Sequence, residues 1–365
     1  MTGYTPSAGA WYAYGGPEND VVLSTRVRLA RNLANFPFPS KFRGDDAERV
    51  QTLVFDSFAQ SEHPDCYQAL AVKDLDELGA KILCERGVLE SDAKTVPGSG
   101  IVVRTDGKVA CAINVRDHVR ICAFVPGLAG AAAYDMCHEM DAELQKKLQF
   151  AASYDFGFLT SSFADSGSGM KVSVRLHLPA ISFSSRLGEY VKQVQEKGVE
   201  LSACFGSGTE CGSSLGSFYQ VSTKSSATGS EFDQMAVIVS AVKYLAESER
   251  REREAVMKNR PTEMMNEVVR ALATAMYASL MPLRESVDII GKIKWGKDAG
   301  ILTGIEDGDL CALLYRVQDG HLQFVLKDGS FQFSDDVAGN EMLKINQLRA
   351  RTLCEAFEEI KVNTH

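Results

Sequence analysis

The sequence has 365 residues and a formal net charge of −9. A chain of this length exceeds one average domain and can bury a sizeable core, so we expect two domains. Its acidity excludes nucleic-acid binding through overall charge, and any phosphate must therefore be held by a local group of basic side chains.

The composition also bears on compartment and metals. Residues 1–16 carry neither a basic nor an apolar segment, and no later stretch approaches about 18 uninterrupted apolar residues, which predicts a cytoplasmic protein without membrane contact. The nine cysteines are odd in number and lack paired spacing, which favours reduced thiols over a disulfide framework. Zinc-ligand spacings are absent, so no metal bound directly by the protein is expected.

The first strong pattern is VVLSTRVRLARN at residues 21–32, which follows an irregular arm over 1–20. In an extended chain, alternation places Ser24, Arg26 and Arg28 on one face and the apolar residues on the other. Side chains on the same face of a strand lie roughly 6.5 to 7 Å apart, so the two guanidinium groups could hold neighbouring phosphate oxygens. The simpler alternative is a half-buried strand with outward arginines.

Two helices and an antiparallel meander are predicted next. Asp45 can cap a helix that continues to Phe58, and a second helix is predicted over 72–90. Residues 101–105 and 108–114 flank a turn with an Asp-Gly pair, which predicts a hairpin. A third strand over 116–125 would place Arg116, His118 and Arg120 on one face. A lone histidine in a strand is usually structural, whereas its arginine neighbours favour a functional role for His118.

The middle of the chain mixes strands and helices. We predict a helix over 128–149, strands at 153–163, 171–179 and 216–224, and a short helix over 178–196. The Gly-rich turn before residue 171 leads into a strand with Lys171, Ser173 and Arg175 on one face, and such turns let backbone N–H groups approach an anion. Walker-type and dinucleotide-binding glycine motifs are absent.

The last third is predicted to be mainly helical. A long amphipathic helix over 230–257 ends in the charged run 247–258, which is expected to be solvated. Pro261 then breaks the pattern, and this gives the predicted domains 1–258 and 259–365. Further helices are predicted at 263–280, 285–302 and 340–360, with a small hairpin over 321–333.

Four motifs in order resemble those of the phosphagen (guanidino) kinase family, and most closely its bacterial protein-arginine kinase branch. They are VVLSTRVRLARNL at 21–33, INVRDHVRI at 113–121, SGSGMKVSVRLHLPAI at 166–181 and GTECGSSLGSFYQVS at 208–222. The segment GKIKWGKDAGILTGI at 291–305 also looks like that branch, and the resemblance spans about residues 18–352.

The resemblance implies an α+β fold, in which an antiparallel sheet flanked by helices forms a glutamine-synthetase-like catalytic domain ahead of a mainly helical C-terminal domain. It implies transfer of the ATP γ-phosphoryl to a guanidino nitrogen, with Mg²⁺ held mainly through the ATP phosphates. It assigns the catalytic carboxylate to Glu210 and a surrounding pocket to Arg116, His118 and Ser162. The ATP-binding residues that it implies are Ser24, Thr25, Arg26, Val27, Arg28, Arg120, Lys171, Val172, Ser173, Val174 and Arg175.

Several positions depart from the family pattern. The family has a glutamate pair where this sequence has Val115 and Arg116, although a guanidinium acceptor needs a carboxylate to orient it and take its proton. Arg116 would also repel a guanidinium acceptor. Ser162 stands at the position of the family's reactive cysteine, Lys171 replaces an arginine, and Phe205 falls at another phosphate-binding arginine. The segment INQLRA, residues 345–350, keeps only Arg349 and Ala350 of the branch's phosphoarginine-docking motif.

The sequence therefore leaves three functions open. The first is an ATP:guanidino phosphotransferase that acts on arginine in proteins. The second is a catalytically impaired pseudokinase that binds nucleotide or phosphate and serves as a regulatory or partner-binding protein. The third is phosphoryl transfer to a non-guanidino acceptor. The expected partners are ATP and arginine side chains of protein substrates, without nucleic acid or membrane, and the resemblance suggests a homodimer.

Overall fold

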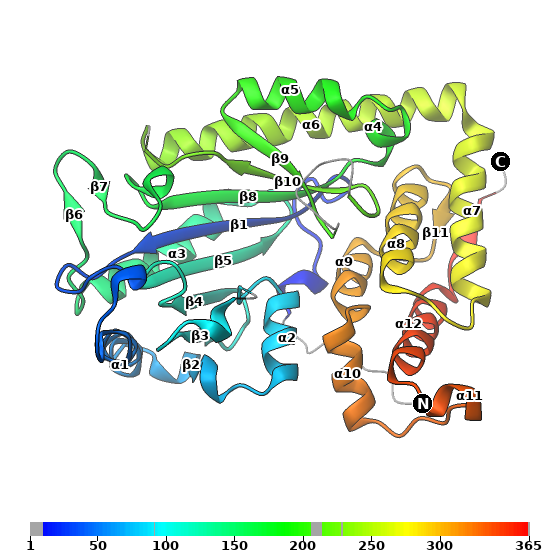
Figure 1. Cartoon of the computed structure of the whole chain (residues 1–365). Coiled ribbons are helices and arrows are strands. Elements are labelled where there is room, and N and C mark those ends of the chain that lie inside the picture. Colours follow the sequence, from blue (N-terminus) through cyan, green and yellow to red (C-terminus); the bar gives the residue numbers. More distant parts are fainter. Residues whose placement is uncertain (1–9, 91, 206–213, 228, 364–365) are drawn as a thin grey trace. The chain divides into compact units, whose positions relative to one another are not determined.

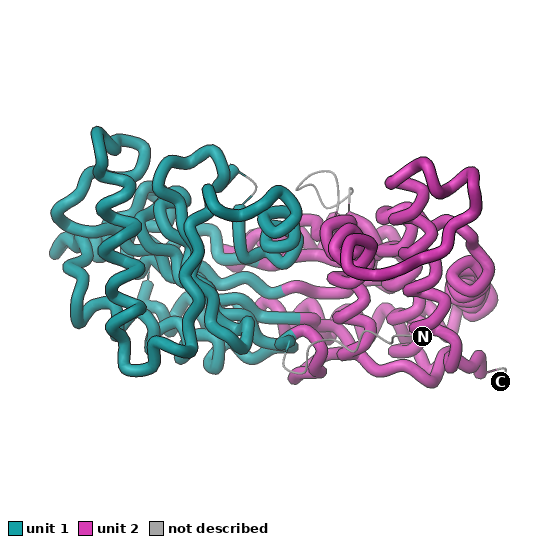
Figure 2. Tube along the Cα trace, turned by 90° about the horizontal axis from the view of Figure 1, so that it is seen from below, with its two compact units in different colours: residues 1–11, 24–174, 222–240 teal, residues 12–23, 175–221, 241–365 magenta. Residues whose placement is uncertain are grey.

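The computed structural model describes residues 10–90, 92–205, 214–227 and 229–363. The chain forms two compact units, each built from separate stretches of sequence (Figure 2). Unit 1 comprises Met1–Trp11, Ser24–Val174 and Ser222–Ser240, and unit 2 comprises Tyr12–Leu23, Arg175–Val221 and Ala241–His365. The domain boundary near residue 258 stays a prediction; helix α6 ends at Asn259 and helix α7 begins at Pro261.

An eight-stranded sheet has the strand order β2-β3-β4-β5-β1-β8-β10-β9 (Figure 1). The pairings of β1 with β5, β2 with β3, β3 with β4 and β4 with β5 are antiparallel, which confirms the expected α+β class with an antiparallel sheet. The strands are β1 Val22–Arg31, β2 Tyr67–Ala71, β3 Gly100–Arg104, β4 Val109–Ile113, β5 Val119–Pro126, β8 Met170–His177, β9 Val199–Ala203 and β10 Phe218–Thr223.

Strand β1 follows the predicted alternation. Val27 and Leu29 are fully buried, whereas Arg26 and Arg28 are partly exposed on the other face. Helix α3, Gly130–Gln145, lies against the apolar face: Cys137 Sγ reaches the Val27 carbonyl at 3.3 Å. Helix α3 therefore does not cover the face of β1 that carries Arg26 and Arg28, and this face remains available to a ligand.

The third predicted strand begins later than expected. Residues 114–118 form a bend, and β5 starts only at Val119. Asn114 and Arg116 have positive φ angles of 59° and 69°, which the alternation of a strand does not allow. The Asn114 side chain holds this bend by donating to the carbonyls of Ala47 and Gly98 at 2.9 and 2.7 Å.

Other elements of unit 1 also differ from the prediction. The helix expected over 72–90 is α2, Glu77–Glu85, because Asp76 caps it by accepting a hydrogen bond from Gly79 N at 2.7 Å. The strand expected at 153–163 is only a short hairpin outside the large sheet. The remaining elements here are α1 Asp46–Ala59, β6 Ala152–Ser153 and β7 Gly157–Phe158.

Unit 2 is mainly helical in its C-terminal stretch, as expected. The hairpin predicted over 321–333 is wrong: this region contains helix α10, because Leu322 and Leu326 lie one helical turn apart and pack with Ile345 and Leu348. The helix predicted over 178–196 is divided into α4 and α5. The helices are α4 Pro179–Phe183, α5 Leu187–Glu196, α7 Pro261–Tyr277, α8 Leu283–Asp298, α9 Asp307–Arg316, α10 Asp319–Asp328, α11 Asp335–Ala338 and α12 Glu341–Phe357, with short strands β11 Leu302–Thr303 and β12 Lys361–Val362.

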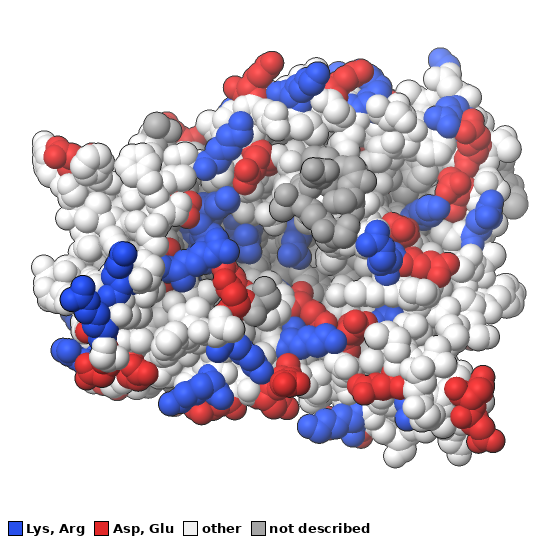
Figure 3. All heavy atoms as spheres, in the orientation of Figure 1, with Lys and Arg blue, Asp and Glu red and all other residues white. Residues whose placement is uncertain are grey.

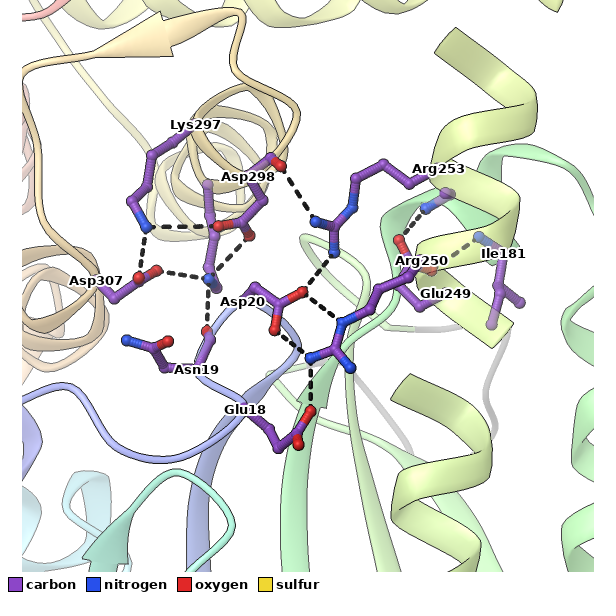
Figure 4. Close-up of polar contacts among 12 residues, drawn as sticks. Glu18, Asn19, Asp20, Ile181, Glu249, Arg250, Arg253, Lys297, Asp298 and Asp307 are labelled. Carbon is purple, nitrogen blue, oxygen red and sulfur yellow. Dashed lines mark hydrogen bonds and ion pairs between the residues drawn. The ribbon is translucent and has the colours of Figure 1, made fainter. Parts of the chain in front are cut away.

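The charged end of helix α6, Glu231–Asn259, is solvated on one face only: Glu247, Arg251 and Glu254 are exposed as predicted, whereas Glu249, Glu252 and Arg253 are buried. Figure 4 shows the polar contacts of Glu249, Arg250 and Arg253. Arg250 pairs with Glu18 and Asp20 at 2.6 Å each, and Arg253 Nη2 lies 3.3 Å from Asp20. The Glu249 carboxylate accepts hydrogen bonds from the backbone N–H groups of Ala180 and Ile181, at the start of α4, at 2.8 and 3.0 Å. The run is therefore part of an ion-pair network that holds the segment with Glu18 and Asp20 in unit 2.

Candidate functional site

The pairing of β1 with β5 brings basic side chains together. Arg28 lies opposite Cys122, and Ala30 lies opposite Arg120. Opposite residues on antiparallel strands point to the same face, so Arg28 and Arg120 are diagonal neighbours, and Arg26 shares their face. We call Arg26, Arg28 and Arg120 the arginine cluster. Figure 3 shows Lys and Arg side chains gathered over strands β1, β5 and β8.

The charges of the arginine cluster act on one another. Burial, then the positive charge of Arg120 and that of Arg26, lower the pKa of Arg28 to about 10, with Cys122 and Asp165 opposing this shift. Arg28 nevertheless remains a cation at neutral pH. An anion placed among these groups would relieve their repulsion, which is the electrostatic property of a phosphate site.

Two protein carboxylates already face the cluster. Asp165 Oδ2 lies 3.0 Å from Arg28 Nη2. Glu90 pairs through Oε1 with Arg120 Nη1, and its Oε2 lies 2.8 Å from Arg116 Nε. Glu90 belongs to no motif, and sequence analysis missed it. Only folding brings Glu90, in the segment after α2, next to Arg116 and Arg120.

Several buried polar atoms on this face lack a hydrogen-bond partner among the described residues. They are the Nε atoms of Arg28 and Arg120 and the Oγ of Ser173 on strand β8. Buried donors are normally satisfied, and each such exception needs an explanation. A phosphate group offers several acceptor oxygens, and it can satisfy these donors once the groups that cover them move aside. The residues present are therefore compatible with a polyphosphate ligand.

The other unit 1 residues of the expected ATP-binding set lie either in the core beneath the arginine face or on that face. Thr25 Oγ1 donates to the Gly127 carbonyl at 2.7 Å. Val27, Val172 and Val174 are fully buried, so they belong to the core. Ser24 is 8% exposed on the arginine face, and Lys171 is partly exposed at the start of β8.

Arg175 belongs to unit 2, where Nη1 donates to the Tyr315 hydroxyl at 3.0 Å. Its guanidinium lies 5.7 Å from the centre of the Phe205 ring, so the residue at the altered arginine position is an aromatic contact. Glu210 lies outside the described residues.

His118 has a structural position. Its Nδ1 accepts a hydrogen bond from Leu33 N at 2.8 Å, so Nε2 carries the proton and donates to the Pro37 carbonyl at 2.9 Å. The ring stacks on Phe42 with 5.2 Å between centroids and is fully buried. Burial lowers its pKa, which keeps the imidazole neutral. Both ring nitrogens of His118 are therefore used within the fold, which agrees with the structural alternative for this residue.

The bend at 114–118 brings two other nominated residues together. Asp117 Oδ1 accepts from Asn32 Nδ2 at 2.8 Å and from Ser161 N at 2.7 Å. Ser161 Oγ also donates to the Arg116 carbonyl at 2.5 Å. These bonds place the segment that contains the exposed Ser162 beside Arg116, whose side chain is 66% exposed.

Arg349, from the degenerate docking motif, is fully buried in unit 2. Its Nε donates to the Val317 carbonyl at 2.7 Å, its Nη1 donates to the Met281 carbonyl at 2.8 Å, and its Nη2 pairs with Asp319. Its guanidinium therefore joins three parts of unit 2 rather than facing a ligand.

The sheet thus carries a cluster of arginines suited to an anionic ligand, and the comparisons identify the class of protein. Residues 49–252, more than half of the chain, match the family model of the ATP:guanido phosphotransferase C-terminal catalytic domain. The chain belongs to the ATP:guanido phosphotransferase family.

Within the family, its curated relatives include protein-arginine kinases. The protein-arginine kinase of Halothermothrix orenii is 29% identical, and the alignment covers 86% of this chain and 89% of that kinase. The protein-arginine kinase of Syntrophomonas wolfei is 31% identical, and the alignment covers 84% of this chain and 86% of that kinase. Among solved structures, the duplicated taurocyamine kinase of Schistosoma mansoni with bound transition state analog components has a TM-score of 0.58 at 21% identity. That alignment covers 71% of this chain and 39% of the kinase, and supports the fold alone.

The described residues include no group of three or more His, Cys, Asp or Glu side chains placed to hold a metal ion. Within the same residues, no helix has both the length and the apolar character needed to cross a membrane.

Proposed function

We propose that this protein transfers the γ-phosphoryl group of Mg·ATP to arginine side chains of proteins. The observation that carries the proposal is the arginine cluster, where Arg28 and Arg120 each keep a buried Nε without an acceptor. Membership of the ATP:guanido phosphotransferase family supplies the reaction class, and the named activity of the curated relatives supplies the acceptor.

Each part of the site has a distinct task in this reaction. Arg26, Arg28 and Arg120, with Lys171 from the next strand, neutralise the ATP phosphates and align them for in-line transfer. Mg²⁺ bound between the phosphates supplies further charge neutralisation. Glu210 is the carboxylate proposed to orient the acceptor guanidinium and take its proton.

A specific observation also favours a second function, that of a pseudokinase that binds nucleotide without transferring phosphate. Val115 is 1% exposed and packs in a core cluster with Val72 and Ile101, so position 115 supplies no group to an acceptor. Arg116, the next residue, presents a positive charge instead of a carboxylate. The same phosphate site serves both functions.

Three further properties are proposed on sequence and family grounds. They are a cytoplasmic location, a homodimeric state, and a division into a catalytic domain over 1–258 and a helical domain over 259–365.

The test is to incubate the purified protein with Mg·ATP and an arginine-containing protein, and to measure acid-labile phosphate on arginine. Transfer by the wild type that is lost in Arg28→Ala supports the kinase. Arg104→Ala is the matched control, because Arg104 also lies in the sheet of unit 1 but pairs with Asp106 in its own hairpin at 2.8 Å. ATP binding without any transfer favours the pseudokinase, and absence of both overturns the phosphate site.

A further inference from the structure

Glu90 occupies the arginine face in the way that a bound anion would. One carboxylate oxygen pairs with Arg120 Nη1, and the other lies 2.8 Å from Arg116 Nε. Two oxygens of one anionic group thus bridge two guanidinium groups, as two oxygens of a phosphate do. The carboxylate of Glu90 therefore stands in for phosphate oxygens.

The bridge leaves polar groups unsatisfied. Glu90 Oε2 forms its ion pair with Arg116 without accepting a hydrogen bond, and Arg120 Nε has no acceptor among the described residues. The Arg120 side chain is only 5% exposed, so water does not readily compensate for the missing acceptor. A phosphate offers more acceptor oxygens than a carboxylate and can satisfy more of these donors.

The Glu90 carboxylate and a bound phosphate cannot both pair with Arg120 Nη1 at the same time. A phosphate that reaches Arg120 Nη1 meets the Glu90 carboxylate at the same nitrogen, and two anions at that separation repel. Glu90 can move away from Arg120, since its side chain is 34% exposed and it lies outside the helices and strands, between α2 and the turn at Ala93–Thr95. The Arg120 backbone stays in place, because it is paired in β5 between β1 and β4.

We propose that Glu90 is a resident counter-anion of the nucleotide-phosphate site, which holds Arg120 in the absence of ligand and must be displaced from Arg120 when ATP binds. The inference rests on the proposed function in that it takes the arginine cluster to be the phosphate site. It adds a positioning residue that regulates occupancy of that site. The apparent affinity for nucleotide is reduced by the fraction of molecules in which Glu90 holds Arg120.

The test compares ATP affinity and stability in Glu90→Gln, measured by calorimetric titration with Mg·ATP and by thermal unfolding without ligand. Glutamine has nearly the same shape but no charge, so it competes weakly for Arg120. We expect Glu90→Gln to bind ATP about tenfold more tightly and yet to unfold at a lower temperature, because Arg120 loses its counter-ion. A purely structural role would weaken both properties together.

Asp92→Asn is the matched control. It removes an equal charge two residues away at an exposed position, and no described ion pair joins Asp92 to Arg116 or Arg120. We expect its ATP affinity to equal that of the wild type. Inorganic tripolyphosphate as a second probe should show the same ranking of variants, since the competition concerns phosphate oxygens.

The outcomes separate the two proposals. Unchanged or weaker ATP binding by Glu90→Gln, with clear binding by the wild type, overturns the role of Glu90 and leaves the proposed function intact. Tighter binding by Asp92→Asn to the same degree also overturns it, because the effect would then be one of general charge. If neither the wild type nor Glu90→Gln binds ATP or tripolyphosphate, the phosphate site and the role of Glu90 both fail.

Discussion

Reversing the charge of Arg116 should increase transfer to arginine. The Arg116 side chain is 66% exposed and its Nε lies 2.8 Å from Glu90 Oε2, so its repulsion of an acceptor guanidinium about 4 Å away is at most the value in water, about 1 kcal/mol. The effects that follow are therefore upper values. Replacing repulsion by an equal attraction changes the transition-state free energy by about 2 kcal/mol, or about 30-fold in kcat/KM. Arg116→Gln, which only removes the repulsion, should give about fivefold.

Both substitutions suit the local backbone. Arg116 already adopts a φ of 69°, and glutamate or glutamine at this position carries a similar backbone cost. The assay is the rate of acid-labile phosphate formation on an arginine-containing protein at saturating Mg·ATP, so that changes in nucleotide affinity do not contribute.

Lys94→Glu, a charge reversal at an exposed residue in the segment between α2 and β3, is the control and should leave the rate unchanged. The ranking wild type, then glutamine, then glutamate is the signature of an electrostatic effect on the acceptor. If the glutamate variant is no faster than the wild type, or if Lys94→Glu accelerates transfer equally, the reasoning about Arg116 is refuted.

Three predictions concern stability. Asp141→Ala should lower the free energy of unfolding by about 3 to 5 kcal/mol in urea titrations, because Asp141 pairs at 2.9 Å with Arg31 and both side chains are 2% exposed; a loss below about 1 kcal/mol would contradict this. His118 has a pKa lowered by burial, so the unfolded chain binds more protons below its ordinary pKa of 6.5 and stability should fall as pH decreases below that value. His118→Asn should flatten this dependence between pH 7 and pH 5, and an unchanged slope would exclude His118 as its source. Gly291→Ala should lower the unfolding temperature, because a Cβ at this position in α8 would lie 2.4 Å from the Gly216 carbonyl oxygen; an unchanged temperature would show that the segment at Gly216 adjusts without cost.

Much of unit 1 could be predicted from local patterns. Alternation in residues 21–32 identifies a strand with Arg26 and Arg28 on one face, because in-out periodicity is a property of each extended segment alone. The same reasoning failed at 114–118. There, Asn114 bonds to carbonyls of two distant segments and stabilises a bend, and periodicity contains no information about such partners.

In residues 321–333, tertiary packing also decided whether the chain forms a helix or a strand. Residues 321–333 contain apolar spacings that suit either structure, and the contact of Leu322 with Ile345 and Leu348 selects the helix. Likewise, the charged end of α6 looked solvated in sequence, yet Arg250 and Arg253 are paired with acids from the N-terminal arm. Charge by itself does not reveal whether a partner far along the chain is available.

The sequence by itself determined the family, the basic residues of the site and the loss of carboxylates at positions 115 and 116. These are properties of residue type and order along the chain. Only the tertiary structure decided that Arg28 and Arg120 share one face, that His118 is structural, and that Glu90 supplies a carboxylate to Arg116 and Arg120. The physical reason is that electrostatic partners are set by distances in space, and strand pairing brings together residues that are about ninety positions apart in the chain.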